Sequence, residues 1–233
     1  MSDVLRKGLI HEPHRTRCTG TLHSRAVLGR LHLVRHAEVA NPRHVCYGNL
    51  PGFGLSPEGR AQAEAAAAHL ASLGAGLLLT SPLQRARETA EAIASVLCIA
   101  AEADERLTEW RLAVRWNGVV WEDLPAAFPG EVEAYLEHPA HLPFSPESLA
   151  AAAARVVGLV EDLGRRHPGA TAVLVSHQDP VQAARLALTG RDLANLHRAK
   201  PSHASVVTLL PGQPWQEAGY WEPAPGRPPF PPV

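Results

Sequence analysis

Arginine and histidine side chains follow apolar stretches at three places in the sequence. Arg35 and His36 end the first stretch, Arg85 comes shortly after a second, and His177 directly follows a third. Brought together, two guanidinium groups and two imidazoles would form a dense anion site, because the planar donors of arginine match phosphate oxygens. Each residue alone is also explained by ordinary strand-end or helix-surface polarity. Only their joint placement indicates a site for a phosphoryl group.

The elements that must position these side chains are strands that alternate with helices. Such alternation, with strands apolar on both faces, predicts a three-layer α/β/α sandwich with a mostly parallel central sheet. Ligands of such sheets bind beyond the carboxyl ends of the strands, where all three polar sites fall. Strands are predicted over 30–34, 77–80, 171–176 and 204–210, and helices over 56–74, 81–97, 145–169 and 179–188.

Composition excludes several classes of partner. The chain has 233 residues and a formal net charge of -1, so no long-range field favours nucleic acid or an anionic membrane. It contains no apolar run near the roughly 20 residues that span a bilayer, and its first residues lack the apolar core of a signal peptide. The three cysteines fit neither a disulfide framework nor a zinc site. We therefore expect a cytoplasmic protein with no membrane partner. The sequence says nothing about its oligomeric state.

The chain divides into one domain with two tails. Residues 1–29 are polar without clear periodicity, and we expect a flexible N-terminal extension. Residues 30–210 form the predicted domain, and 211–233 a proline-rich tail in which proline excludes a continuous helix or a central strand. Three aromatic residues of the tail could hold an extended segment against the domain surface, namely Trp215, Tyr220 and Trp221.

Five sequence blocks between about residues 30 and 210 resemble the histidine phosphatase superfamily, branch 1, which is also called phosphoglycerate mutase-like. "RHAE" is similar to its RHG signature, "LSPEGRAQA" to the helix that follows, and "TSPLQRARETA" to its Ser-Pro-Leu-x-Arg-Ala block. "DERLTEW" resembles its acid-bearing segment, and "VLVSHQDP" its second-histidine strand. Five blocks in the right order are specific, whereas "RH" alone would not be.

The resemblance implies a role for each matching residue. His36 would take the phosphoryl group on a ring nitrogen, while Arg35, Arg85 and His177 hold its oxygens and Glu109 acts as general acid. The implied activity is hydrolysis of a small phosphorylated metabolite through a phosphohistidine, without a metal or another cofactor. Two fixed arginine forks suit this chemistry, because phosphoryl transfer depends mainly on positioning and charge neutralisation.

Three positions near these blocks depart from the family pattern. Ala37 replaces the usual glycine of RHG, which we expect the backbone to tolerate where φ is negative. Asn41 lies one residue closer to His36 than the phosphate-contacting asparagine of many members, and we still expect it to bind phosphate. Gln178 stands where glycine usually follows the second histidine, and we also expect it on the phosphate-binding side.

Asp179 is a second candidate for the general acid. Acid phosphatases of the family's other branch place an aspartate acid directly after the second histidine, which makes Asp179 a rival to Glu109. The alternative is that Asp179 caps a helix beginning at Pro180.

The segment between Glu109 and His177 bears on the type of reaction. The true mutases have a longer insertion here, with an Arg-Arg-Ser stretch for a carboxylate, so the shorter segment favours hydrolysis. A mutase-type phosphotransferase and a non-catalytic binder of a phosphorylated ligand remain alternatives. The segment is rich in aromatic residues, which predict either a substrate-selecting lid or a small satellite core: Trp116, Trp121, Phe128 and Tyr135.

Charged residues of the same segment have two interpretations. Arg111 and Arg115 either contact an anionic substrate or lie on a solvated face. Glu147 and Ser148 resemble the end of the family's Gly-Glu-Ser segment. A metal site in "HPAH", 138–141, is disfavoured because its proline keeps the two histidines off one helical face.

Overall fold

The apolar segments of the chain form one mixed six-stranded sheet with the order β3-β2-β4-β1-β5-β6. The computed structural model describes residues 26–224. In chain order the strands are β1 (Arg30–Arg35), β2 (Leu77–Thr80), β3 (Ala101–Ala103), β4 (Thr171–Ser176), β5 (Val206–Leu210) and β6 (Gln216–Trp221). The helices are α1 (Pro57–Leu70), α2 (Gln84–Leu97), α3 (Arg111–Arg115), α4 (Leu124–Ala127), α5 (Glu131–Glu137), α6 (Leu149–Arg166) and α7 (Gln178–Leu188). Three short 3₁₀ helices complete the fold: η1 (Glu105–Leu107), η2 (Trp121–Asp123) and η3 (Leu193–Asn195).

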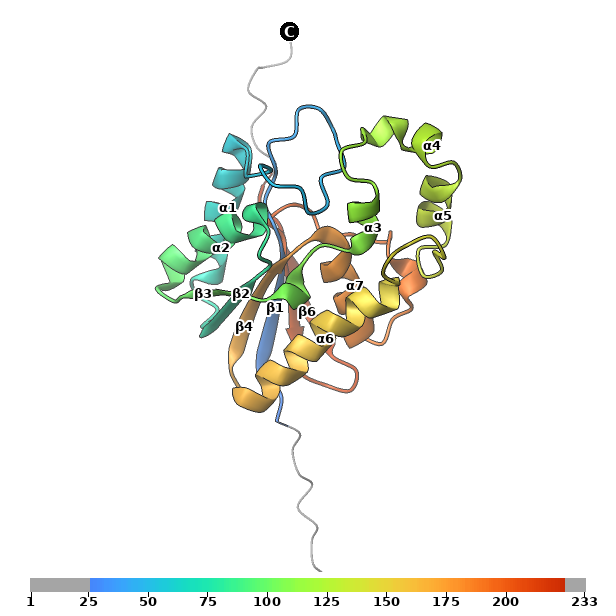
Figure 1. Ribbon diagram of the computed structural model, residues 1–233. Coiled ribbons are helices and arrows are strands. Elements are labelled where there is room, and N and C mark those ends of the chain that lie inside the picture. The colour runs from blue at the N-terminus through green and yellow to red at the C-terminus, as the bar shows by residue number, and fades with distance from the viewer. Residues whose placement is uncertain (1–25, 225–233) are drawn as a thin grey trace, which may run out of the picture.

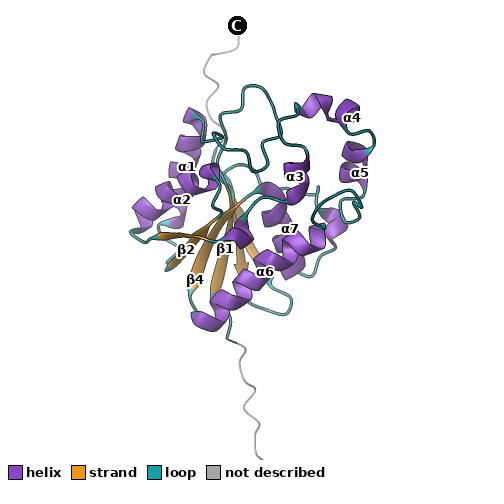
Figure 2. Cartoon of the chain, viewed as in Figure 1, coloured by secondary structure: helices purple, strands orange, loops and turns teal. Residues whose placement is uncertain are grey.

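Helices cover both faces of this sheet (Figures 1 and 2). On one face, α1 and α2 pack through Ala67 and Ile93 onto β2 and β4. On the other, α6 and α7 pack through Val160 and Val181 onto β1 and β4. The predicted three-layer α/β/α sandwich is therefore confirmed.

Strand β1 lies inside the sheet, and its carboxyl end positions Arg35 and His36. It pairs in parallel with β4, so that Arg35 lies opposite Ser176, and it pairs antiparallel with β5. Strands β2 and β4 are also parallel. The carboxyl ends of β1, β2 and β4 consequently meet at one end of the sheet, where loops and short helices gather (Figure 2). This is the end at which the sequence places its arginines and histidines.

Helix α1 begins as the sequence predicts. The Oγ atom of Ser56 accepts a hydrogen bond from the amide of Gly59 at 2.8 Å, which satisfies a free donor of the first turn. A Cβ on Gly59 would lie 2.0 Å from the carbonyl oxygen of Glu38, so only glycine allows this close approach. The helix thereby fixes the loop that follows His36.

Two helices start later than their Ser-Pro pairs predict. Helix α2 begins at Gln84, because Ser81 lies at the end of β2 and bonds elsewhere. Helix α6 begins at Leu149, and its cap is Ser148, whose Oγ accepts from the amide of Ala151 at 3.1 Å. Ser148, one of the two residues that resemble the Gly-Glu-Ser segment, is therefore a helix cap.

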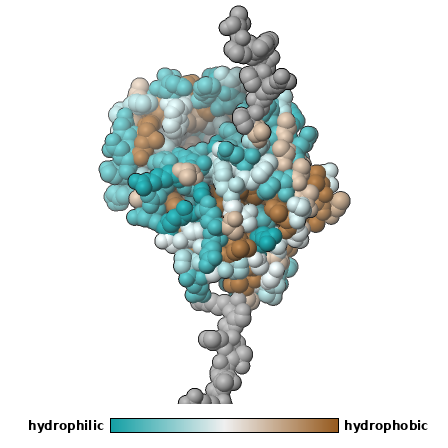
Figure 3. Space-filling model, turned by 180° about the vertical axis from the view of Figure 1, so that it is seen from behind, coloured by the Kyte–Doolittle hydropathy of each residue, from teal (hydrophilic) through white to brown (hydrophobic). Residues whose placement is uncertain are grey.

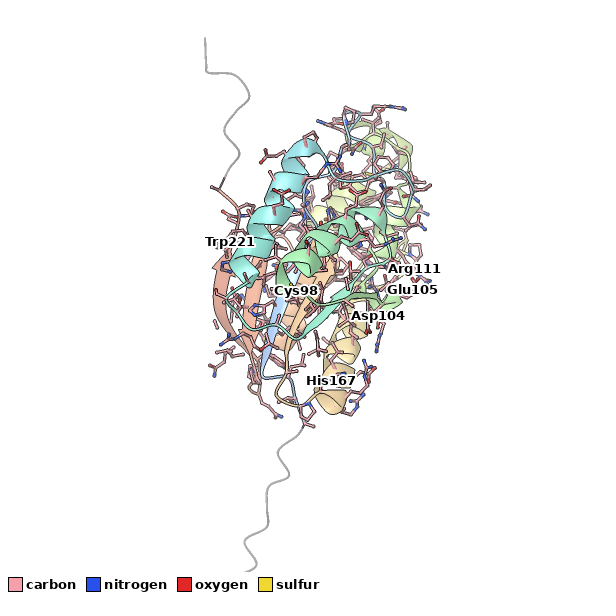
Figure 4. All side chains as sticks on the ribbon, turned by 90° about the vertical axis from the view of Figure 1, so that its left-hand side faces the viewer. Cys98, Asp104, Glu105, Arg111, His167 and Trp221 are labelled. Carbon is pink, nitrogen blue, oxygen red and sulfur yellow. The ribbon has the colours of Figure 1, made fainter. Side chains whose placement is uncertain are left out.

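The sheet continues beyond residue 210. Residues 216–221 form the edge strand β6, which pairs antiparallel with β5, and the ring of Trp221 stacks on His69 of α1 at a centroid distance of 4.5 Å (Figure 4). Tyr220 and Trp221 of the predicted tail thus belong to the sheet itself, whereas Trp215 precedes β6 and packs against the core. At the other end, Leu28 is fully buried in the core, although the sequence placed it in a flexible extension. The remainder of the two predicted tails, 1–25 and 225–233, lies outside the described residues.

The segment between β3 and α6 forms a separate small core beside the sheet (Figure 1). Trp110, Leu112 and Trp116 pack there with Leu124 and Tyr135 from the short helices. The predicted satellite core is therefore present.

Among residues 26–224, no helix is long and apolar enough to cross a membrane. The face shown in Figure 3 mixes hydrophilic and hydrophobic patches. Cys46 and Cys98 are free thiols.

Candidate active site

His36 lies directly after β1 with only 2 % of its surface exposed. Its amide donates to the carbonyl of Ser176 at 2.8 Å, and its Nδ1 lies 2.8 Å from the carbonyl oxygen of Ala37. A carbonyl only accepts hydrogen bonds, so Nδ1 carries the proton and Nε2 keeps its lone pair. Burial, with Arg85 and Arg35 nearby, lowers the pKa of His36 well below its ordinary value. The imidazole is therefore neutral, with Nε2 free to act as a nucleophile.

Arg85, the second residue of α2, lies against this nitrogen. Its Nε donates to Nε2 of His36 at 3.3 Å and its Nη2 donates to the carbonyl of Gly48 at 2.8 Å. The ring of Tyr47 covers the guanidinium with its centroid 4.7 Å from Cζ. Gly48 has φ +25°, and a Cβ there would lie 2.7 Å from the carbonyl oxygen of Ala113, so glycine is required. The arginine is held on three sides, 1 % exposed.

Arg35 is held on the other side of His36. Its Nη1 donates to the carbonyl of Pro201 at 2.9 Å, and its Nη2 donates to Nε2 of His203 at 2.7 Å. Burial and the guanidinium lower the pKa of His203 to about 3, so this imidazole accepts. The buried Nε of Arg35 has no hydrogen-bond partner in the protein, and it remains available to an anion.

His177 completes the group predicted from the sequence. Its ring centroid lies 5.2 Å from that of His36, and its Nε2 lies 2.8 Å from Oγ of Ser81. Burial and Arg85 lower its pKa well below the ordinary value. Its Nδ1 is buried without a hydrogen-bond partner, 3.7 Å from Oε2 of Glu109. The structure therefore brings all the predicted core residues together.

Glu109 closes the group, between η1 and α3. Its Oε2 lies 3.7 Å from both Nη2 of Arg85 and Nδ1 of His177, and its Oε1 accepts from the amide of Trp110 at 2.8 Å. Burial raises the pKa of Glu109 to about 7, although Arg85 opposes the change. A carboxyl group with this pKa can both donate and accept a proton near neutral pH.

Arg155 of α6 fixes the segment that carries Glu109. It donates to the carbonyls of Arg106 at 2.6 Å and Glu109 at 3.2 Å, and its Nε donates to Oε1 of Glu147 at 2.9 Å. The Nε1 of Trp110 donates to the carbonyl of Glu147 at 2.8 Å. Glu147, the other residue that resembles the Gly-Glu-Ser segment, thus supports the site from outside.

Asn41 and Gln178 both line the cavity above His36, which has a volume of about 410 Å³. The amide group of Asn41 is occupied, because it donates to the carbonyl of Val45 at 2.9 Å and accepts from the amide of Val45 at 3.2 Å. Asn41 therefore closes a turn over residues 41–45, shortly before Gly48. The Nε2 of Gln178 lies 3.4 Å from Asp179, so this side chain is only weakly held. Phosphate binding by these two residues stays a prediction.

Asp179 also faces the cavity, and it does not cap a helix. Helix α7 begins at Gln178 with His177 as its cap, which places Asp179 inside the first turn. The Oδ2 atom of Asp179 accepts from the hydroxyl of Tyr135 at 3.0 Å, and its Oδ1 lies 3.8 Å from Nζ of Lys200. The helix-cap interpretation is wrong because the backbone turns into the helix two residues early.

The aromatic side chains of the segment 110–137 form the outer wall of the cavity. Trp116, Trp121 and Tyr135 line it, whereas Phe128 packs on the guanidinium of Arg115. The satellite core therefore also forms a wall of the cavity, and its role as a substrate-selecting lid stays a prediction.

The two arginines of this segment lie away from the cavity. Arg115 pairs with Glu131, its Nη2 lying 2.6 Å from Oε1. Arg111 is exposed at the outer surface (Figure 4). The interpretation of both as substrate contacts is not supported by this geometry. His138 and His141 are exposed, and residues 26–224 contain no group of three or more His, Cys, Asp or Glu side chains placed to hold a metal ion.

Comparison with known proteins agrees with this arrangement. A family profile described as the histidine phosphatase superfamily (branch 1) matches residues 31–217, which covers most of the chain. The chain belongs to this superfamily. The assignment drawn from the five sequence blocks is confirmed.

Relatives within the histidine phosphatase superfamily include named enzymes. Phosphoserine phosphatase 1 of Hydrogenobacter thermophilus is 33 % identical over 181 residues, which cover 77 % of this chain and 85 % of that protein. The uncharacterized protein Rv0525 of Mycobacterium tuberculosis is 38 % identical over 198 residues, covering 78 % and 89 %. The structure of mycobacterial glucosyl-3-phosphoglycerate phosphatase Rv2419c is similar with a TM-score of 0.75 and 29 % identity, over 84 % of this chain and 99 % of that one.

Several residues of the site carry no sequence signal of their own. Four residues bond to predicted residues or to each other but lie far from the blocks in sequence or outside regular strands: Ser81, Tyr135, Lys200 and His203, the last two in one loop before β5. Only Ser81 lies inside one of the five blocks, TSPLQRARETA, and this position is the one signal that could have indicated a site role for it.

Proposed function

We propose that this member of the histidine phosphatase superfamily hydrolyses small phosphomonoesters through a phosphohistidine on Nε2 of His36. In the first step, Nε2 attacks phosphorus and the ester P–O bond breaks, while Glu109 protonates the leaving alcohol oxygen. In the second step, Glu109 takes a proton from water, whose oxygen attacks phosphorus and releases inorganic phosphate and the free imidazole. Arg35 and Arg85 neutralise the equatorial oxygens in both steps.

The bond from Nδ1 of His36 to the carbonyl of Ala37 is the observation that carries this proposal. It selects the tautomer with a lone pair on Nε2, which lies 3.3 Å from a donor of Arg85. A nucleophile and a fixed cation at that separation suit in-line attack on a bound phosphoryl group.

Glu109 supplies the second requirement, a proton that is available near neutral pH. Its Oε2 is close to Arg85, which holds the phosphoryl group in the proposal, so the leaving oxygen lies within its reach. Burial keeps a substantial fraction of this carboxyl protonated near pH 7. The proposed chemistry needs no metal ion, because the arginines provide the positive charge.

The test is steady-state hydrolysis of an aryl phosphate in the presence of EDTA, comparing wild type with His36→Gln. The exposed His138, outside the cavity, gives a matched control in His138→Gln. We expect EDTA-resistant turnover in wild type and control, and at least about 10³-fold less in His36→Gln. Protein denatured rapidly at alkaline pH, where the P–N bond survives, should contain phosphohistidine in wild type and in His138→Gln but not in His36→Gln.

Two other results would redirect the assignment. Undiminished turnover in His36→Gln would remove the phosphohistidine from the mechanism. An inactive wild type should next be given 3-phosphoglycerate with a bisphosphate primer, and binding of the ester measured by calorimetry. Isomerisation would identify a mutase-type phosphotransferase, and binding alone would identify a non-catalytic binder. The cytoplasmic location stays a prediction.

A further inference from the structure

The part of the cavity beyond the phosphoryl site has a distinctive chemistry. Besides His36 and Glu109, its lining carries two carboxylates, Glu122 and Asp179, and the indole of Trp121. This is the side where the leaving alcohol of a bound phosphomonoester would lie, if the proposed function holds.

The arginines at the base of the cavity are committed to the phosphoryl group and the protein. Arg35 is bonded to Pro201 and His203, and Arg85 to Gly48 and His36. The buried Nε of Arg35 has no partner in the protein, and in the proposed function the remaining donors of both arginines bind the phosphoryl group. Neither guanidinium is left to bind a carboxylate on the leaving group.

The cations around the outer wall are also paired. The Nζ atom of Lys200 donates to the hydroxyl of Tyr135 at 3.0 Å and lies 3.8 Å from Asp179, which compensates the charge of that carboxylate. Arg115 is held by Glu131. In the part of the chain that the structure describes, Arg35 is the only arginine or lysine that lines the cavity.

Glu122 therefore carries the charge that a leaving group meets. Its position is fixed by the backbone, because Val45 and Val120 form a β-bridge and the amide of Trp121 donates to the carbonyl of His44 at 2.9 Å. The Nδ1 of His44 lies 3.5 Å from Oε1 of Glu122. Trp121 directly precedes Glu122, lines the same cavity and is 42 % exposed. A carboxylate next to an indole ring attracts an ammonium group.

We infer that the site selects phosphomonoesters of amino alcohols over phosphomonoesters that carry a carboxylate, and that Glu122 determines this preference. An ammonium group on the leaving alcohol lies near Glu122 and the ring of Trp121. A carboxylate at the same place is repelled and finds no free cation. This inference rests on the proposed hydrolysis and names its substrate class.

The test uses esters that differ mainly in the charge of the alcohol. Ethanolamine phosphate carries an ammonium group, glycerol phosphate is neutral, and 3-phosphoglycerate carries a carboxylate. L-Phosphoserine, which adds a carboxylate to ethanolamine phosphate, forms a second matched pair. At about pH 8, where histidine side chains in general carry little charge, we expect kcat/KM to fall about threefold at each step from ammonium to neutral to carboxylate. A threefold change corresponds to about 0.7 kcal/mol, which is the interaction of two unit charges, one on the substrate and one on Glu122, at about 6 Å in water.

Charge reversal at Glu122 provides the decisive variant. Glu122→Lys should lower the ratio of kcat/KM for ethanolamine phosphate to that for 3-phosphoglycerate by about tenfold or more, and Glu122→Gln should give an intermediate ratio. Glu133→Lys makes the same change on the exposed face of α5, outside the cavity, and should leave the ratio unchanged. Circular dichroism and thermal unfolding show that each variant is folded, and Glu133→Lys should hydrolyse glycerol phosphate at the wild-type rate.

Two results would overturn the inference. Wild type that prefers 3-phosphoglycerate to ethanolamine phosphate contradicts it, as does a ratio that Glu122→Lys leaves unchanged. If none of the esters is hydrolysed in a way that depends on His36, the proposed function itself fails and the inference falls with it. A failure of selectivity alone leaves hydrolysis intact, so the two failures are distinguishable.

Discussion

The raised pKa of Glu109 predicts that this residue weakens the fold at neutral pH. Burial raises the pKa from the ordinary 4.5 to about 7 in the folded protein. Between these values the folded state binds more protons than the unfolded state, so the free energy of unfolding falls as pH rises. The gap of about 2.5 pKa units, at about 1.4 kcal/mol each, corresponds to a loss of about 3 to 4 kcal/mol above pH 7. Glu109→Gln removes this titration.

Urea unfolding of wild type and Glu109→Gln at about pH 5 and pH 8 measures the effect. The difference between the two proteins cancels the titration of the histidines, which they share. We expect the variant to gain about 2 to 3 kcal/mol relative to wild type between these pH values. The exposed carboxylate of Glu133 gives the control Glu133→Gln, which should follow wild type. Equal pH slopes for wild type and Glu109→Gln would show that Glu109 ionises normally, and the proposed acid would lose its support.

Three further perturbations test individual residues. On an alkyl phosphate, Glu109→Gln should lower kcat/KM by about 10²- to 10⁴-fold. The loss should be much smaller on an aryl phosphate, because a phenol leaves without protonation. A larger loss in Asp179→Asn than in Glu109→Gln would move the acid role to Asp179. Arg35→Lys keeps the charge but loses the fork that bonds Pro201 and His203, and we expect kcat to fall about 10²-fold; an unchanged kcat in that variant would contradict the positioning argument. Burial lowers the pKa of His32 from 6.5 to about 4, so the unfolded state binds more protons between these values and the free energy of unfolding decreases as pH falls. Urea unfolding of His32→Asn should show a smaller decrease than wild type between about pH 7 and pH 4. Equal decreases in the two proteins would show that His32 does not contribute to the acid sensitivity.

The regular part of the fold could be predicted because its signals are local. Strands β1, β2 and β4 are short apolar runs, and α1 has a serine cap followed by proline. Strands β3 and β6 lack such signals. Strand β3 is only three residues long, Ala-Glu-Ala, and β6 contains a glycine and follows a proline-rich turn. Both form because a neighbouring strand offers free backbone groups, and a single-sequence pattern does not contain that information.

The core of the site could be predicted because its residues lie in recognisable blocks, whereas their partners do not. His203 bonds to Arg35 across 168 positions of sequence, and Tyr135 meets Asp179 across 44. No spacing rule connects such pairs. Asn41 shows that residue type alone does not reveal whether a side chain is free to bind a ligand. An asparagine suits phosphate, but the amide group of Asn41 is already bonded to Val45.

Arg155 joins two parts of the molecule that could otherwise diverge independently. It bonds to the backbone at Arg106 and Glu109, so Glu109, the proposed proton donor, is fixed by main-chain carbonyls that any residue can supply. The segment from α3 to α5, which carries the outer wall of the cavity, lies beyond this junction. Side chains of this segment that face the cavity can therefore change while the backbone position of Glu109 is retained. The arrangement offers a practical route to engineering new substrate preferences on one reaction centre.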